Sequence, residues 1–78
     1  MSILKFSSEG CGPCYALAVM LDDLMVDYDE IDIAKNMELA IEHRVRSVPV
    51  LINTSNNNRM DGFKDKETVE AWLNDNQS

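Results

Sequence analysis

Cys11 and Cys14 are the only cysteines among the 78 residues of this chain. A disulfide between them would close a very short loop, which removes little entropy from the unfolded chain. A domain of this size has a thin stability margin, because it buries a small share of its surface. The fold therefore has to come from regular helices and strands around one core, and we expect a single domain over residues 1–78.

The apolar pattern predicts seven elements in the order β-α-β-α-β-β-α. An apolar run at 3–6 indicates the first strand, and Gly12-Pro13 opens a helix, because proline fits the first turn of a helix. Apolar residues at helical spacing continue this helix to Leu24. The other expected elements are an edge strand at 26–33 with its charges facing water, a helix capped by Asn36, a strand at 47–52, a short strand at 59–61 and a helix capped by Asp65.

The order of these elements predicts the topology. A strand-helix-strand unit implies that the first two strands are parallel and joined by a right-handed crossover. The asparagine-rich turn at 54–58 implies that the last two strands form an antiparallel hairpin. We therefore expect an α/β fold with one mixed four-stranded sheet flanked by three helices.

The charge balance excludes some partners. Seven Lys and Arg residues stand against fourteen Asp and Glu residues, which gives a net charge of -7. Nucleic acids and anionic membranes demand excess positive charge, so neither is expected as the main partner. The longest apolar run, 16–21, is too short to span a membrane, and the N-terminus lacks the pattern of a secretory signal. We expect a cytoplasmic monomer.

The segment Cys11-Gly12-Pro13-Cys14 stands between the first expected strand and the first expected helix. Thiol–disulfide exchange needs a thiolate, and the N–H groups and dipole at a helix N-terminus stabilise that anion. Cys11 precedes the helix on a loop, whereas Cys14 lies in the first turn and should be more buried. We therefore predict that Cys11 attacks a target disulfide and that Cys14 resolves the product.

A cysteine pair has two other common uses in proteins. A closed zinc or iron–sulfur site needs four ligands, and the chain adds one histidine, His43, and no third cysteine. We expect no metal and no cofactor besides a redox-active Cys11–Cys14 disulfide. An inert pair of core cysteines is less favoured in a chain that begins β-α-β.

These residues resemble the thioredoxin superfamily. Cys11-Gly12-Pro13-Cys14 matches the active-site motif of thioredoxins, and Val48-Pro49 before a strand is similar to the cis-proline loop of the superfamily. Gly62-Phe63 after the hairpin resembles the closing segment of the small glutaredoxin-like reductants that serve ribonucleotide reductase. The resemblance covers nearly the whole chain. Its length is typical of the glutaredoxin-sized form, and its cysteine motif is typical of thioredoxins.

The resemblance implies roles for the motif. Cys11 would form a mixed disulfide with the target, and Cys14 would release the target and leave the pair oxidised. Gly12 and Pro13 would form the active-site loop between the two cysteines.

The resemblance also implies a substrate-binding surface. Val48 would pair its backbone with an extended substrate strand, a form of β-augmentation. Pro49 would keep a cis bond, so that no backbone N–H crowds the sulfurs. Gly62 and Phe63 would complete this surface.

The chain departs from thioredoxins at two positions. Thioredoxins have a tryptophan before the first cysteine, where this chain has Gly10, and a buried aspartate on the preceding strand that assists proton transfer from the resolving thiol. That strand offers Lys5 instead, which we expect to be a solvated strand-end residue. A lysine that pointed inward would favour thiolates. No general base for Cys14 is assigned.

The predicted function is the reduction of disulfides in proteins such as ribonucleotide reductase, with electrons from a thioredoxin reductase-like flavoenzyme. One alternative is a glutaredoxin that uses glutathione, which the chain length favours and the absence of a glycine pair after Gly62 opposes. Another is a binding or accessory module that works without redox turnover.

Overall fold

The computed structural model describes residues 3–76 and confirms the predicted order of elements. The strands are β1 (Ile3–Ser7), β2 (Asp29–Asp32), β3 (Val50–Asn53) and β4 (Arg59–Asp61). The helices are α1 (Gly12–Asp23), α2 (Met37–Glu42) and α3 (Lys66–Asn76).

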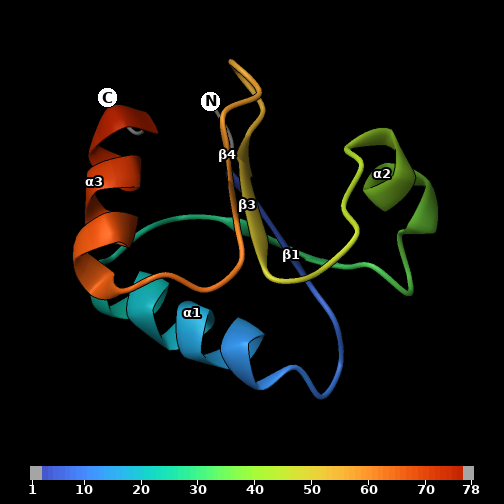
Figure 1. The fold of residues 1–78 in the computed structure, drawn as a ribbon, viewed down its shortest axis with the longest axis horizontal. Helices are drawn as coiled ribbons and strands as arrows, with labels where there is room; N and C mark the ends of the chain where they lie inside the picture. Colours follow the sequence, from blue (N-terminus) through green and yellow to red (C-terminus); the bar gives the residue numbers. More distant parts are fainter. Residues whose placement is uncertain (1–2, 77–78) are drawn as a thin grey trace.

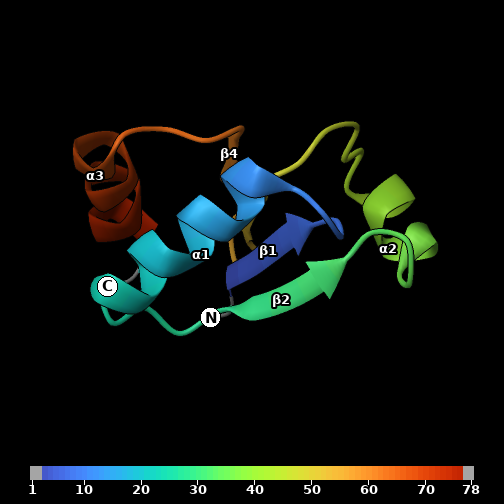
Figure 2. The same cartoon turned by 90° about the horizontal axis from the view of Figure 1, so that it is seen from below.

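The four strands form one mixed sheet in the order β2-β1-β3-β4. Strand β1 is parallel to β2 and antiparallel to β3, and β3 is antiparallel to β4. Helices α1 and α3 lie on one face of the sheet and α2 lies on the other (Figure 1). Figure 2 shows β1 and β2 running in the same direction, as the crossover through α1 predicts. The expected α/β fold is confirmed.

Each face of the sheet carries its own apolar cluster. The cluster beneath α1 and α3 consists of Ile3, Leu17, Leu21, Val26, Leu51, Met60, Val69 and Leu73. The cluster beneath α2 consists of Phe6, Ala40, Val50 and Ile52. Strand β1 contributes to both, so it is covered on its two faces.

The two predicted helix caps have different outcomes. Asp65 caps α3, because its Oδ1 accepts a hydrogen bond of 2.8 Å from the Thr68 N–H. Side-chain and backbone hydrogen bonds from Thr68 lower the pKa of the Asp65 carboxyl. Asn36 lies at the N-cap of α2, but its side chain donates to the Asp32 carbonyl, 3.1 Å away, instead of capping the helix.

Strand β2 is an edge strand, as predicted, but it is shorter than expected. It spans Asp29–Asp32, because the preceding chain leaves α1 through a left-handed residue, Met25 (φ 58°), and buries Val26 in the core. One of its charged side chains does not only face water: the Glu30 carboxylate forms an ion pair with Lys5.

Lys5 is fully buried, so the expectation of a solvated lysine is wrong. Side chains alternate along a strand, which places Ile3, Lys5 and Ser7 on the face beneath α1. The Lys5 Nζ donates to both carboxylate oxygens of Glu30, at 2.9 and 2.8 Å. Glu30 is the register partner of Lys5 on β2, and its side chain stays 51% exposed. Because both faces of β1 are covered, the Lys5 ammonium is paired with a carboxylate on the neighbouring strand and is not hydrated by bulk water.

Within residues 3–76, no helix has the length and apolar character needed to cross a bilayer.

We expect Lys5→Met to fold and to unfold at the same temperature as the wild type or higher. Methionine has a similar length, and replacing a buried charge by an apolar group removes a desolvation cost that the ion pair only partly offsets. The half-exposed Glu30 remains hydrated after its partner is lost. Thermal unfolding followed by circular dichroism measures the effect, and Lys35→Met, at an exposed lysine, matches the change in net charge. A loss of about 3 kcal/mol or more would show instead that the ion pair holds the fold together.

Candidate active site

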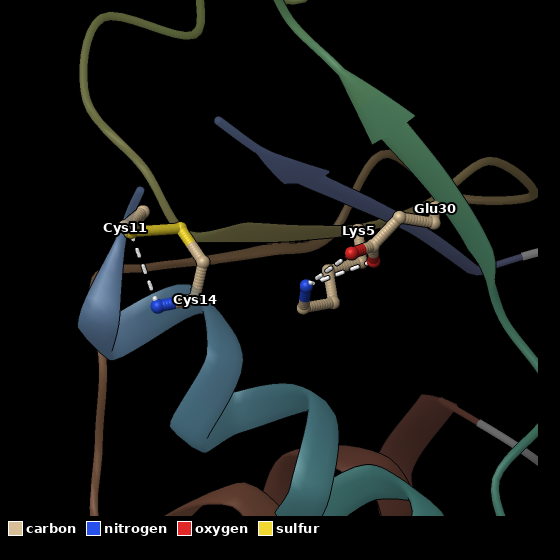
Figure 3. The surroundings of a disulfide bond; sticks show 4 residues. All are labelled: Lys5, Cys11, Cys14 and Glu30. Atoms are coloured by element: carbon tan, nitrogen blue, oxygen red, sulfur yellow. Dashed lines mark hydrogen bonds and ion pairs between the residues drawn. A yellow bond between two sulfur atoms is a disulfide. The ribbon is translucent and has the colours of Figure 1, made fainter. Parts of the chain in front are cut away.

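Cys11 and Cys14 form a disulfide at the start of α1, with their Cα atoms 5.2 Å apart (Figure 3). Cys11 is the N-cap residue of the helix, and Pro13 lies in the first turn. The Cys14 N–H donates to the Cys11 Sγ at 3.1 Å. The Cys11 sulfur therefore takes the position of a capping oxygen and meets a backbone donor that would stabilise a negative charge on it.

The two sulfurs differ in their access to solvent. Cys11 is half-buried, whereas Cys14 is 3% exposed. Gly12 and Pro13 between them are exposed. The predicted difference between an accessible first cysteine and a buried second cysteine is confirmed, and an incoming disulfide can reach Cys11 alone.

An open cavity of about 490 Å³ adjoins the disulfide. Its walls come from the loop after β1, the first turns of α1 and one residue of β2: Ser7, Ser8, Gly10, Cys11, Gly12, Cys14, Tyr15, Ala18 and Glu30. This volume has room for several water molecules, each of which takes about 30 Å³ in the liquid. The cavity therefore gives the buried Cys14 a solvent path that also passes the Glu30 carboxylate.

The Lys5–Glu30 ion pair lies on the same side of the sheet as the disulfide. In Figure 3 the Lys5 side chain rises from β1 toward α1, with its ammonium between Cys14 and the Glu30 carboxylate. The hydrogen bonds of the Lys5 ammonium among the described residues go to Glu30, and none goes to either sulfur.

The Val48–Pro49 peptide bond is cis, as the resemblance implied. Val48 is half-buried and Pro49 is buried. The three views agree that this segment passes beside the start of α1 on its way into β3 (Figures 1, 2 and 3).

The segment after β4 is tied to the same loop. The Gly62 N–H donates to the Pro49 carbonyl at 2.8 Å, and Gly62 has a left-handed backbone (φ 85°) that suits glycine. Phe63 beside it is 44% exposed. The structure thus brings the four predicted substrate-binding residues together, although none of them lines the cavity at the cysteines. Their role in binding a substrate stays a prediction.

The burial of Lys5 and its ion pair with Glu30 were not predicted from the sequence. The available signal was that the strand with Lys5 lies inside a sheet flanked by helices, which cover its side chains on the two sheet faces. A charged residue there needs a partner on a neighbouring strand, and Glu30 is the carboxylate in register with it.

Among residues 3–76, no group of three or more His, Cys, Asp or Glu side chains could hold a metal ion.

Gly10, where thioredoxins have tryptophan, is exposed and has a left-handed backbone (φ 76°). The surface in front of the first cysteine is therefore made by a backbone turn instead of an aromatic ring.

Comparison with known proteins agrees with this geometry. The thioredoxin family model matches residues 1–75. The chain is 31% identical over 82 residues to a thioredoxin of Staphylococcus epidermidis, covering 94% of this chain and 79% of that protein. It is also 31% identical over 80 residues to mitochondrial thioredoxin of Mus musculus, covering 91% of this chain and 48% of that protein, so it spans about half the length of such mitochondrial relatives.

Solved structures show the same fold. A mutant thioredoxin from Halobacterium salinarum superposes with a TM-score of 0.84 at 23% identity, covering 99% of this chain and 74% of that one. A thioredoxin of Malassezia sympodialis gives a TM-score of 0.83 at 17% identity, covering 99% of this chain and 75% of that one. With the family model matched over nearly the whole sequence, the chain belongs to the thioredoxin family.

Proposed function

We propose that this protein is a dithiol–disulfide oxidoreductase that reduces disulfides in other proteins. The observation that carries the proposal is the pairing of an accessible sulfur, Cys11, with a buried one, Cys14, at the N-terminus of α1. The backbone donor on the Cys11 sulfur favours its thiolate, which is the form that attacks a disulfide.

The reaction has two exchange steps. The Cys11 thiolate attacks one sulfur of the target disulfide, forms a mixed disulfide and releases the other target sulfur as a thiolate. Cys14 then loses its proton and attacks the Cys11 sulfur, which forms the Cys11–Cys14 bond and releases the second target thiolate. The target gains two electrons and the protein loses two. The Cys11–Cys14 disulfide of the structure is the form in which this reaction would leave the protein.

We propose that the substrate lies along the loop of Val48 and Pro49 as an added strand, flanked by Gly62 and Phe63. The exposed aromatic ring and the position of this loop beside α1 support this. Ribonucleotide reductase is the first protein substrate to test, and a thioredoxin reductase-like flavoenzyme is the proposed electron donor. We propose that residues 1–78 act as one monomeric domain in a reducing compartment such as the cytoplasm.

Insulin reduction with dithiothreitol as donor tests the proposed activity. We expect the wild type to accelerate insulin reduction well above the background rate, and Cys11→Ser to return it to background, because the attacking thiolate is gone. Cys14→Ser is the matched control, since it makes the same exchange of sulfur for oxygen at the other end of the motif. This variant should retain the first step and accumulate a mixed disulfide through Cys11. Full activity of Cys11→Ser would contradict the proposal, and function retained by the double serine variant would favour a binding module.

The electron donor can be identified by a second assay. We expect the oxidised protein to be reduced by NADPH with a thioredoxin reductase more than tenfold faster than by glutathione with glutathione reductase. The reason is that Gly62 is followed by Phe63 instead of a second glycine, so the loop lacks the glycine pair that glutaredoxins present to glutathione. Consumption of NADPH reports both rates. Faster reduction by glutathione would identify the protein as a glutaredoxin.

A further inference from the structure

We propose that Lys5, held by Glu30, is the positioning residue that favours the thiolate of Cys14 when this cysteine resolves the mixed disulfide. The inference deepens the proposed function and rests on it. In the second exchange step, the Cys14 thiolate would be stabilised by a cation on β1, at the position where thioredoxins carry an acid.

The burial of Lys5 is the first observation behind this inference. A fully buried lysine loses its hydration, and its ion pair with a half-exposed carboxylate is a poor source of stability compared with an apolar side chain. The apolar cluster on the same sheet face includes Leu17 and Leu21 of α1 and Leu51 of β3, which is the register partner of Lys5, so a methionine at this position would have apolar neighbours. A charge at this position therefore calls for a reason other than packing.

The second observation is the direction of the ion pair. The ammonium lies on the Cys14 side of the Glu30 carboxylate in Figure 3. The pair as a whole is neutral, but its positive end faces the sulfur, and an opposite charge nearby favours the charged form of a thiol. Both hydrogen bonds to Glu30 fix the ammonium in this orientation.

Few other titratable groups face this region. Tyr28 lies beneath the ammonium, with its ring centre 6.0 Å from the Lys5 Nζ. Burial raises the pKa of the Tyr28 phenol, and Asp22 and Glu30 raise it further, so this group is neutral near pH 7. Tyr15 is the remaining titratable group on the cavity wall, and β3 contributes only the apolar Leu51 to the face beside Lys5. Lys5 and Glu30 are therefore the charged side chains that the structure places beside Cys14.

The ammonium assists one defined step. In the mixed disulfide, Cys14 is a free thiol, and its proton passes to solvent in the cavity that Cys14 and Glu30 both line. The resulting thiolate attacks the Cys11 sulfur, the Cys11–Cys14 bond forms, and the bond from Cys11 to the target breaks. The departing target thiolate takes up a proton from water. Lys5 keeps its charge throughout, so it acts on Cys14 without exchanging a proton.

The test is the pKa of the Cys14 thiol, read from the pH dependence of its Cβ chemical shift in a Cys11→Ser background. This background removes the coupled titration of the second thiol. We expect Lys5→Met to raise this pKa by about one unit, because the cation is gone and the Glu30 anion remains. We expect Glu30→Gln to lower it, because the cation is then no longer offset. Lys5→Arg should stay close to the wild type.

Opposite shifts from two neighbouring substitutions distinguish a charge effect from a packing effect. Glu30 is half-exposed, so Glu30→Gln can be measured even if a substitution at Lys5 impairs folding. Lys35→Met is the matched control, since it removes an equal charge from an exposed site and should leave the pKa of Cys14 unchanged. With both cysteines present, Lys5→Met should also slow release of the target from the mixed disulfide up to tenfold near pH 7.

An unchanged pKa in Lys5→Met, or shifts of the same sign in Lys5→Met and Glu30→Gln, would overturn the inference. This outcome is distinct from failure of the proposed function, which would show as a wild-type protein that does not reduce insulin. If the wild type reduces insulin but the pKa of Cys14 is the same in Lys5→Met, the proposed function stands and the inference is rejected.

Discussion

Strand β1 is covered by protein on both faces, and this constraint determines where the groups of the site lie. Its backbone pairs with β2 on one side and β3 on the other, and helices lie over both faces of the sheet, so its side chains are largely shielded from water. The strand ends directly before the loop that carries Cys11, which places the sulfurs over the sheet face that holds Lys5. Strand β1 and the segment that follows it therefore place an accessible sulfur, a buried sulfur and a buried cation close together.

The position of the cation changes the electrostatics expected of this fold. Thioredoxins carry a buried aspartate on the strand that leads to the motif, and this chain has Lys5 there with a glutamate on the neighbouring strand. An anion beneath a thiol makes it harder to ionise and can accept its proton, whereas a cation stabilises the thiolate directly. In the mechanism that we propose, the two arrangements would support the same exchange step by different means, and the cation should also stabilise the reduced protein against the disulfide.

The order of elements, the pairing of β1 with β2 and of β3 with β4, and the different burial of Cys11 and Cys14 were predicted from the sequence, because each depends on a local signal. Apolar periodicity identifies the strands and helices, the asparagine-rich turn identifies the hairpin, and the proline after Cys11 identifies the start of α1. The position of Lys5 depends on a partner 25 residues away, which no local pattern shows. The Asn36 side chain likewise donates to the Asp32 carbonyl and accepts no hydrogen bond from the first turn of α2. Charged and amide side chains are hard to place from sequence, because their partners are set by tertiary register.

The most direct test of a thiolate-stabilising cation is the reduction potential of the Cys11–Cys14 couple in the wild type and in Lys5→Met, measured at a pH above the pKa of the Cys14 thiol in both proteins. The cation stabilises the reduced, ionised form, so its removal should make the protein more reducing. A pKa change of one unit corresponds to a tenfold change in the exchange equilibrium, or a potential lower by about 30 mV in Lys5→Met. An equal or higher potential in Lys5→Met would contradict the account.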